Sequence, residues 1–515
     1  MIQPATDAGG TRLERLCKKS RDRLLETADK AFPSFGRWRR QRATVAYYRD
    51  GDPKYDKKYN EETTPPEGVE VETLCFWAIE FYMPSQIDGL HKAIERIGWN
   101  KIALFRHDHS TSDWLKKSRQ SPYGGAWKNL GFIYPPGREG LLDYVECELP
   151  GYAEYASAYL YSVTPSLACI AVCFTLREEQ TKQYQQALRR NYKTVPRPHK
   201  NGSTSIVDPT SLKREAIESI RKHLRNGAVS WFERHLPGVF AKHANMDQMP
   251  TIELMTISKD EPFPDRREKT RYLDVLGFSG GWDAWRSEGS DGLFFTPVRD
   301  FSNDELRHHA LLIAQKERFE AKNGFEYYGG ADRRGYVARV SSIISTGPSM
   351  PSLAIPALLS LFENQMASVR DQLGFRTSTR NVLKQIEELE RLVADDFDII
   401  TVGRELQSAA SGGFSRLWSE MDFVWASSHP SAMVGAKLKD ELREGASRRI
   451  QIILSAEAVT RDLLVQFTNL VSSRRNVHLQ RAVYWLTVVL VLLSILMVDW
   501  QKAIGFNPLS FLTSH

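Results

Sequence analysis

Hydrophobic and polar positions divide the chain into a mixed region up to residue 347 and a helical region after it. Within the first region, apolar runs rich in aromatic and β-branched residues end at proline, glycine or polar clusters, which is the pattern of β-strands. The predicted strands are 71–83, 141–149, 152–163, 166–176, 251–258, 271–278, 292–298 and 335–345.

Helical spacing of three and four alternates with these strands. Apolar residues follow it over 85–99 and 178–192, and a long helix begins at Ser211, which is expected to cap it. The stretch 194–210 has the composition of a linker. Strands and helices together predict an α+β or α/β fold, and whether the strands on either side of the linker share one sheet stays open.

After Ser352 the helical spacing continues almost to the end of the chain. Apolar residues repeat at four, three and four over 382–393, and again at threes and fours over 453–470, as in helices that pack along a seam. No proline interrupts 450–498. One helix over that range would be roughly 73 Å long, at 1.5 Å per residue. The pattern therefore predicts an all-α stalk that leads into the last apolar segment and supports self-association.

That last segment, Ala482–Val498, is the strongest single signal in the sequence. Its residues carry no charge, and a helix of this length spans roughly 26 Å, close to the thickness of a bilayer's hydrocarbon core. Tyr484 and Trp485 lie at one end and Trp500 at the other, where amphipathic rings settle among lipid headgroups. The alternative is a buried core helix. We expect a single transmembrane helix, with the lipid bilayer as a partner.

Basic residues before this segment predict its orientation. Arg474, Arg475 and Arg481 precede it, whereas Asp499 and Lys502 nearly cancel after it. The positive-inside rule places the N-terminal bulk in the cytoplasm, below a cell (inner or plasma) membrane, and the C-terminus on the far side.

Two hydroxyl residues inside the segment, Thr487 and Ser494, share a helix face because they are seven positions apart. They could form a contact between membrane helices.

These signals divide the chain into seven parts. They are a basic N-terminal segment 1–70, an α/β-type domain 71–193, a linker 194–210, a second β-containing region 211–347, a helical stalk bundle 348–478, a transmembrane helix 479–501 and a short tail 502–515.

Composition and charge exclude little. With 42% hydrophobic and 26% charged residues the chain is typical of globular proteins. Its net charge of +6 is not gathered into a stripe, so there is no specific nucleic-acid signal. The chain contains neither G-x-x-x-x-G-K-[ST] nor a G-x-G-x-x-G after a strand, and the sequence identifies no cofactor. Five cysteines without a C-x-x-C pair fit reduced thiols.

A G-x-S-x-G pattern at 277–281 is the one candidate for nucleophilic catalysis. It places Ser279 between glycines after the predicted strand 271–278, as a nucleophile elbow requires. The helix that should follow lacks an apolar stripe. A glycine turn between strands is the alternative, and the sequence favours a protein that is not an enzyme.

The densest group of potential metal ligands is His107, His109 and Asp113. In a strand the two histidines would share a face, as two ligands of one ion must. The segment is polar and prone to turns, so a loop is the alternative.

In general plan, the C-terminal third is similar to the CorA-type divalent-cation channels. In that family a stalk helix runs directly into a membrane helix that ends in Gly-Met-Asn; here Gly505, Phe506 and Asn507 follow Trp500. The family has a second membrane helix, whereas only PLSFLTSH follows Asn507. The resemblance implies a stalk that forms homo-oligomers and a divalent cation as a possible partner.

Together these features predict a single-pass, membrane-anchored cytoplasmic protein that binds, senses or acts as a scaffold, and self-associates through its stalk. The alternatives are a CorA-like channel subunit and a membrane-tethered serine hydrolase that uses Ser279.

Overall fold

The fold is described from a computed structural model of the chain. It describes 53–101, 110–121, 124–138, 144–199, 203–242, 248–260, 262, 271–278, 284–298, 308–322, 324–375, 398–412, 416–418, 420–426 and 435–497. The chain forms two compact units. The first comprises Met1–Leu359 with Glu405–Ser447, and the second comprises Ser360–Arg404 with Arg448–His515.

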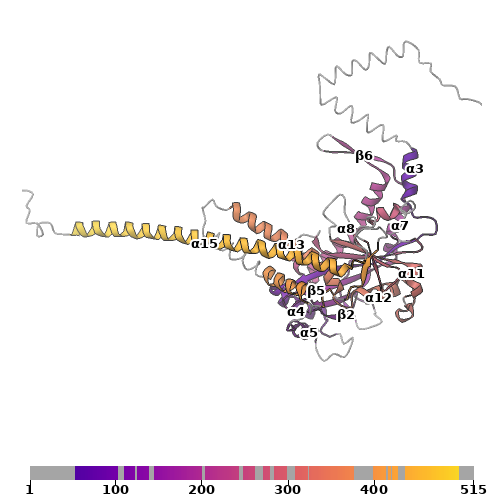
Figure 1. The fold of residues 1–515 in the computed structure, drawn as a ribbon, viewed down its shortest axis with the longest axis horizontal. Coiled ribbons are helices and arrows are strands. Elements are labelled where there is room, and N and C mark those ends of the chain that lie inside the picture. The colour runs from indigo at the N-terminus through magenta and orange to yellow at the C-terminus, as the bar shows by residue number, and fades with distance from the viewer. Residues whose placement is uncertain are drawn as a thin grey trace, which may run out of the picture. The chain divides into compact units, whose positions relative to one another are not determined.

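One twisted sheet of ten strands forms the centre of the first unit (Figure 1). Its strands are β1 (Val71–Tyr82), β2 (Ala126–Tyr134), β3 (Tyr144–Glu146), β4 (Ala153–Ser162), β5 (Ala168–Leu176), β8 (Thr251–Ile257), β9 (Trp285–Ser287), β10 (Leu293–Pro297), β11 (His309–Gln315) and β12 (Phe423–Trp425). Their order is β12-β9-β10-β11-β8-β1-β5-β4-β2-β3. Because β1 pairs with both β5 and β8, the two predicted β-containing regions share a single sheet.

The two halves of the sheet repeat one strand order. Outward from the centre of the sheet, the first half runs β1-β5-β4-β2. The second half runs β8-β11-β10-β9 outward from the centre, so in both halves the first strand in the chain is followed by the fourth, the third and the second. The halves differ at one junction, since β1 and β5 are antiparallel whereas β8 and β11 are parallel.

Helices connect and follow these strands. They are α3 (Pro53–Glu62), α4 (Ile87–Ile97), α5 (Thr111–Arg119), α6 (Glu178–Thr181), α7 (Gln183–Arg189), α8 (Pro209–His235), α9 (Val239–Lys242), α10 (Arg271–Val275), α11 (Lys316–Lys322), α12 (Arg333–Ile344), α13 (Ser349–Phe375) and α15 (Leu438–Met497). Short 3-10 helices occupy η1 (Pro84–Gln86) and η5 (Phe325–Tyr328), and a separate hairpin pairs β6 (Val195–Pro198) with β7 (Thr204–Val207).

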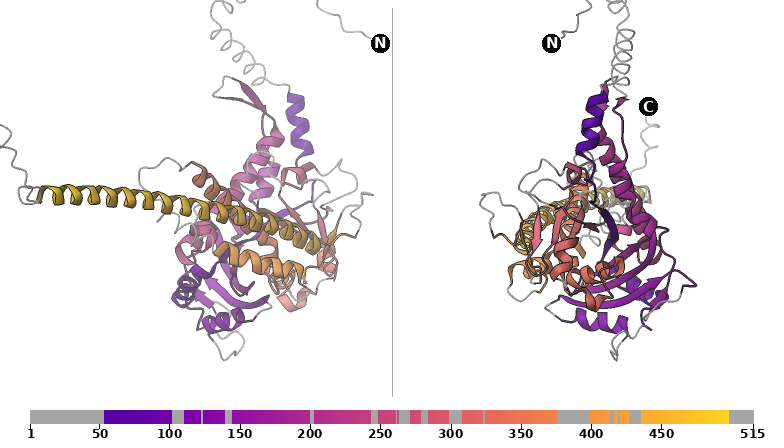
Figure 2. Two further views of the ribbon diagram at one scale, coloured as in Figure 1. Left: turned by 60° about the vertical axis from the view of Figure 1, so that its left-hand side comes forward. Right: turned by 90° about the vertical axis from the view of Figure 1, so that its right-hand side faces the viewer.

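Helices α8 and α12 cover opposite faces of the sheet. Successive side chains of a strand point to opposite faces. On β5, Phe174 meets Trp231 of α8 edge to face. On β4, the Tyr161 hydroxyl donates to the Ser345 carbonyl at the end of α12. Figure 2 shows the long α8 lying along one side of the twisted sheet.

The core between α8 and the sheet buries one face of the apolar central strands. Met255 and Ile313 from the sheet pack with Ile217 of α8 and with Tyr272 and Leu273 of α10, all fully or almost fully buried. Strands buried on both faces read as continuous apolar runs, which is why the sequence predicts β1, β5 and β8 correctly.

Two predicted strands are helices. Residues 271–278 contain α10, and 335–345 lie almost entirely in α12. Asp332 caps α12 by accepting a hydrogen bond from the Gly335 amide, and the helix buries Tyr336, Val340 and Ile344 at helical spacing. The buried β-branched residues of this segment face the protein core from a helix and not from a strand.

The structure also differs from the prediction at the linker and at the start of the helix after it. Residues 194–210 contain the β6–β7 hairpin, and α8 starts at Pro209 with Asp208, not Ser211, as its cap. Asp208 accepts from the Ser211 amide at 3.1 Å, and proline suits the first turn of a helix because it needs no amide donor there.

The predicted all-helical region after residue 348 is interrupted. β12 (Phe423–Trp425) pairs with β9 and closes one edge of the sheet. Residues 405–447 therefore belong to the α/β unit.

Helix α15 begins twelve residues before the predicted start at Ile450 and is unbroken for 60 residues, or about 90 Å. In the second unit the Arg449 guanidinium binds the Glu363 carboxylate of α13. Within α15, Asn476–Ser494 is long and apolar enough to cross a membrane by length and composition, and none of it is buried. The single transmembrane helix stays a prediction.

Candidate functional site

Helix α12 separates two cavities on one face of the sheet, and its first turn is fixed by a carboxylate. Glu154 of β4 is 8% exposed and accepts from Arg138, Arg333 and Arg334. Burial opposes the charge on this carboxylate, but the guanidinium groups outweigh it and lower its pKa. Three cations on one anion leave a local excess of two positive charges.

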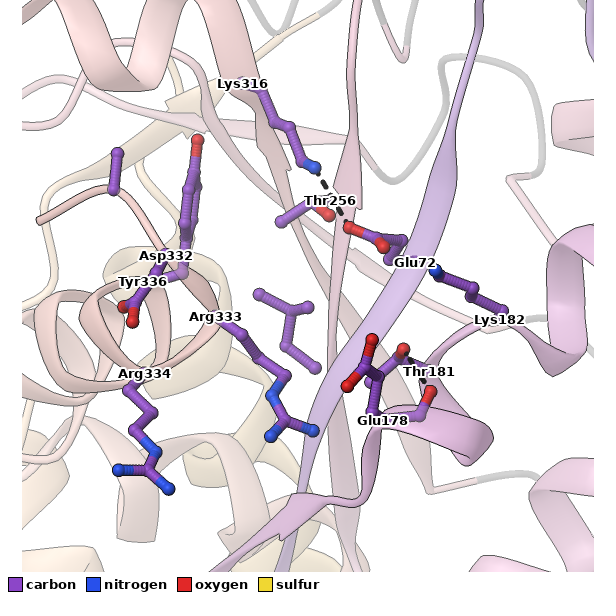
Figure 3. A pocket seen from close by; sticks show the side chains of 12 residues that line it. Glu72, Glu178, Thr181, Lys182, Thr256, Lys316, Asp332, Arg333, Arg334 and Tyr336 are labelled. Atoms are coloured by element: carbon purple, nitrogen blue, oxygen red, sulfur yellow. Dashed lines mark hydrogen bonds and ion pairs between the residues drawn. The ribbon is translucent and has the colours of Figure 1, made fainter.

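The larger cavity, here called the polar pocket, has a volume of about 380 Å³. Figure 3 shows its side chains, which come from β1, β8, α6, α11 and the start of α12. Its lining consists of Glu72, Leu74, Glu178, Thr181, Lys182, Thr256, Lys316, Ala331, Asp332, Arg333, Arg334 and Tyr336.

An ion pair and a buried hydroxyl define the chemistry of the polar pocket. The Lys316 ammonium donates to the Glu72 carboxylate at 2.9 Å, and their side chains are 25% and 21% exposed. Thr256 is fully buried, and its Oγ1 has no hydrogen-bond partner among the described residues. A buried hydroxyl without a partner is costly. A polar ligand could provide the missing hydrogen bond.

Two other charged side chains of this pocket, Arg333 and Asp332, are already engaged. Arg333 donates to the Leu176 carbonyl as well as to Glu154, and the Asp332 carboxylate caps α12. The Glu72–Lys316 pair is a partly buried charged pair that an entering ligand would meet, and the exposed Glu178 and Lys182 also line the pocket. A neighbouring carboxylate and ammonium suit a ligand that carries both charges.

The smaller cavity, here called the tyrosine pocket, has a volume of about 250 Å³. β2, β4, η5 and α12 line it with Asn129, Phe132, Tyr134, Tyr155, Ser157, Tyr159, Tyr328, Arg334, Val337, Ala338 and Ser341. Burial raises the pKa of Tyr155 to about 12 and raises that of Tyr159 further, so both stay neutral. Arg334 lines both pockets.

A buried ion cluster lies on the α8 face of the sheet. Arg221 of α8 donates to Glu253 of β8 at 3.1 Å, and Thr73 donates to the other oxygen of the same carboxylate. His309 Nε2 lies 3.1 Å from Glu253, while its Nδ1 lies 2.8 Å from the Thr251 hydroxyl. Glu253 and His309 are at most 1% exposed. The cluster joins α8, β1, β8 and β11 and is closed to solvent.

The pKa values in the cluster reflect this pairing. Burial would raise the pKa of Glu253, but Arg221 and His309 lower it to about 2. Burial, opposed by the hydrogen bond to Glu253, lowers the pKa of His309 to about 4. At neutral pH the pair is therefore a carboxylate beside a neutral imidazole, which suits a structural role.

A second buried carboxylate, Glu80 of β1, holds the start of α9. Its oxygens accept from the amides of Phe81, Phe240 and Ala241 at 2.8–2.9 Å. Burial is the larger effect and raises the pKa of Glu80 to about 8.

Of the three predicted metal ligands the structure describes only Asp113. His107 and His109 lie outside the described residues. Asp113 is in the first turn of α5, where its amide donates to the Ser110 hydroxyl, which donates back to the Asp113 carboxylate. This is a cap. Within the described part of the chain, no group of three His, Cys, Asp or Glu side chains could hold a metal ion.

Ser279 also lies outside the described residues. The segment before it is α10, not the strand that a nucleophile elbow requires. Gly277 has a φ of 89°, a left-handed conformation that favours glycine. The glycine turn is supported at that position. His309 begins β11.

The predicted membrane residues fall mainly on α15. The exposed residues there are Tyr484, Trp485, Thr487, Ser494 and Arg481. The predicted topology residues Arg474 and Arg475 are on the same helix. The Thr487 hydroxyl donates to the Val483 carbonyl of its own helix. Trp500, Gly505, Phe506 and Asn507 lie outside the described residues.

Comparison with known proteins does not assign this chain. No family model matches it, and neither the curated proteins nor the solved structures gave a match.

Sequence reasoning missed both pockets and the ion cluster. Lining residues of the two pockets run from Glu72 to Ser341, so no local spacing connects them. A signal for the buried carboxylates did exist. Glu80 and Glu253 each stand among apolar residues of a strand, and a charge at such a position needs a buried partner.

Proposed function

We propose that this protein is a membrane-anchored binding protein that senses a small polar ligand from the cytoplasmic side. The α/β unit provides the binding site, and the C-terminal helix provides the anchor. The observation that carries the proposal is the polar pocket. An ion pair lines this cavity together with a fully buried hydroxyl that has no hydrogen-bond partner among the described residues.

The ligand class follows from the Glu72–Lys316 pair. A zwitterion can place its carboxylate on Lys316 and its ammonium on Glu72, so that both protein charges keep a partner of opposite sign. Thr256 can then add a neutral hydrogen bond. A free amino acid carries these groups and is small enough for a cavity of about 380 Å³.

The test is a calorimetric titration of the full-length protein in detergent with each free amino acid. At least one is expected to bind, and Lys316→Gln should weaken that binding about ten-fold or more, since a charged hydrogen bond contributes ~1.5–3 kcal/mol. Lys322→Gln is the matched control, because Lys322 pairs with Asp291 outside the pocket. Equal affinities in the two variants, or no binding by the wild type, would refute the proposed site.

The anchor needs a separate experiment. Asn476–Ser494 supports it, because the stretch is apolar and exposes its side chains along α15. Full-length protein should stay with membranes after alkaline carbonate extraction, whereas a chain truncated after Arg475 should be released. Masses in detergent should show a homo-oligomer for the full chain and a smaller species after truncation. Release of both proteins would contradict the anchor, and a monomer in both would contradict self-association.

One observation favours a second candidate, the CorA-like channel subunit. Helix α15 is unbroken for 60 residues, and its C-terminal part is the apolar stretch, as in a channel whose stalk helix continues into the membrane. This alternative predicts a cation conductance in bilayers that Asn507→Ala abolishes. A purified oligomer without conductance would rule it out and leave the anchored binding protein.

A further inference from the structure

The tyrosine pocket presents flat aromatic surfaces that are already aligned. Tyr134 and Tyr155 stack with their ring centres 5.7 Å apart and an interplanar angle of 27°. Phe132 meets Tyr155 edge to face at 5.9 Å. These rings stand on neighbouring strands β2 and β4, whose pairing fixes them. A rigid row of rings is suited to a planar ligand that stacks.

Polar groups in the same pocket could hydrogen-bond to the edge of such a ring. Ser341 of α12 is 4% exposed, and its Oγ is buried without a hydrogen-bond partner among the described residues. Ser157 of β4 and Asn129 of β2 line the cavity too. The buried Ser341 hydroxyl is an independent sign of a ligand, because a buried hydroxyl in a folded protein normally has a partner.

Charge decides what kind of ring fits. Among the described lining residues the one charged side chain is Arg334, whose guanidinium lies 6.0 Å from the centre of the Tyr155 ring. A cationic ligand, otherwise a natural guest of tyrosines, would be repelled. Beside the pocket, Arg138, Arg333 and Arg334 share the single carboxylate of Glu154. The rim therefore favours an anion.

From this arrangement we propose that the tyrosine pocket binds a nucleotide. The base stacks on the aromatic row and hydrogen-bonds to Ser341, and the phosphate meets the exposed guanidinium groups of Arg334 and Arg138. Their side chains are 52% and 45% exposed. The chain contains no glycine-rich phosphate loop, so phosphate recognition falls to these arginines. This site does not rest on the zwitterion proposed for the polar pocket, with which it shares Arg334 as a lining residue.

The first experiment compares a nucleotide with its fragments. Full-length protein in detergent is titrated calorimetrically with AMP, GMP, CMP and UMP, and with adenosine, ribose 5-phosphate and inorganic phosphate. At least one nucleotide should bind about ten-fold more tightly than each fragment, because stacking and charge both contribute. Saturation-transfer NMR should show the base protons closest to the protein. Raising the salt concentration should weaken nucleotide binding more than nucleoside binding.

Matched variants locate the site. Tyr328 lines the pocket, whereas its neighbour Tyr327 is 90% exposed and does not. Tyr328→Ala should weaken nucleotide binding about ten-fold, and Tyr327→Ala should leave it unchanged. Arg334→Gln should remove the advantage of nucleotide over nucleoside, whereas Arg443→Gln, in an exposed pair with Asp440, should not.

Several results would overturn the proposal. They are absence of nucleotide binding, equal binding of ribose 5-phosphate, equal binding of adenosine, or equal effects of the two tyrosine variants. Binding of a neutral sugar that Tyr328→Ala weakens, without nucleotide binding, would assign the pocket to carbohydrate instead. Failure of the amino-acid titrations would leave this proposal standing, because Tyr328 lines the tyrosine pocket and not the polar pocket.

Discussion

His309 allows a direct test of the buried ion cluster through the pH dependence of stability. The perturbation is His309→Gln. The imidazole is 1% exposed and lies between Glu253 and the Thr251 hydroxyl. In the arrangement that satisfies both contacts, Nε2–H donates to Glu253 and Nδ1 accepts from Thr251. This is the neutral form, in accord with the lowered pKa of about 4.

The magnitude follows from the difference between the folded and unfolded pKa values. Between pH 6.5, the ordinary value, and pH 4 the unfolded chain binds a proton at this histidine and the folded protein does not. The contribution of neutral His309 is therefore fully present above pH 6.5 and is lost as the pH falls toward 4. One proton corresponds to ~1.4 kcal/mol per pH unit, or roughly 3 kcal/mol across the window.

The assay is urea unfolding of the full-length protein in detergent, followed by tryptophan fluorescence, from about pH 7 to about pH 4.5. Wild type and the exposed control His199→Gln should lose stability in parallel as the pH falls. His309→Gln should be less stable at pH 7 but should have a flatter profile. If its slope equals that of the wild type, His309 does not stay neutral in the folded protein and the assignment of the cluster is wrong.

Three further outcomes follow from buried groups. Glu253→Gln should destabilise the α/β unit by about 3–5 kcal/mol in the same urea assay, because it leaves buried Arg221 without a counter-charge; a loss below about 1 kcal/mol would contradict this. The raised pKa of Glu80, about 8, means that its contribution is present below pH 4.5 and lost as the pH rises toward 8, so wild type should lose stability relative to Glu80→Gln over that window. Gly335→Ala should lower the melting temperature, since its added Cβ would lie 1.8 Å from a backbone oxygen, whereas Gly89→Ala meets no atom within 4 Å and should be neutral or stabilising.

The parts of the fold that the sequence predicts are those in which local pattern and tertiary environment agree. β1, β5 and β8 are apolar on both faces because helices cover both sides of the sheet centre. Helix α4 has a clean apolar stripe that includes Leu90 and Ile94.

Elsewhere local pattern and tertiary environment disagree. Residues 335–345 are rich in β-branched residues, yet the Asp332 cap and burial at helical spacing make them α12. β12 is only three residues long, and its pairing with a strand far earlier in the sequence determines its structure. Such tertiary override is beyond what a local pattern can indicate.

The candidate site shows the same limit more strongly. Both pockets exist because α12 lies against strands that come much earlier in the chain, β1 and β8 at the polar pocket and β2 and β4 at the tyrosine pocket. Ser341 and Tyr155 are ordinary helix and strand residues in the sequence, and only the tertiary structure places them around one cavity. Motif spacing offered Ser279 and the histidines at 107 and 109 as candidates, and these lie outside the described residues.

Strand β12 also constrains how the protein can be made. It covers the edge strand β9, with Trp425 against Trp285 edge to face at 5.2 Å, although the two tryptophans are 140 positions apart in the chain. During translation the main-chain groups of β9 cannot pair with β12 until residue 425 has left the ribosome. An uncovered strand edge is a template for aggregation. A nascent chain that stalls before residue 423 should therefore depend on chaperones. Once made, β12 pairs with β9 and protects that strand from pairing with other chains.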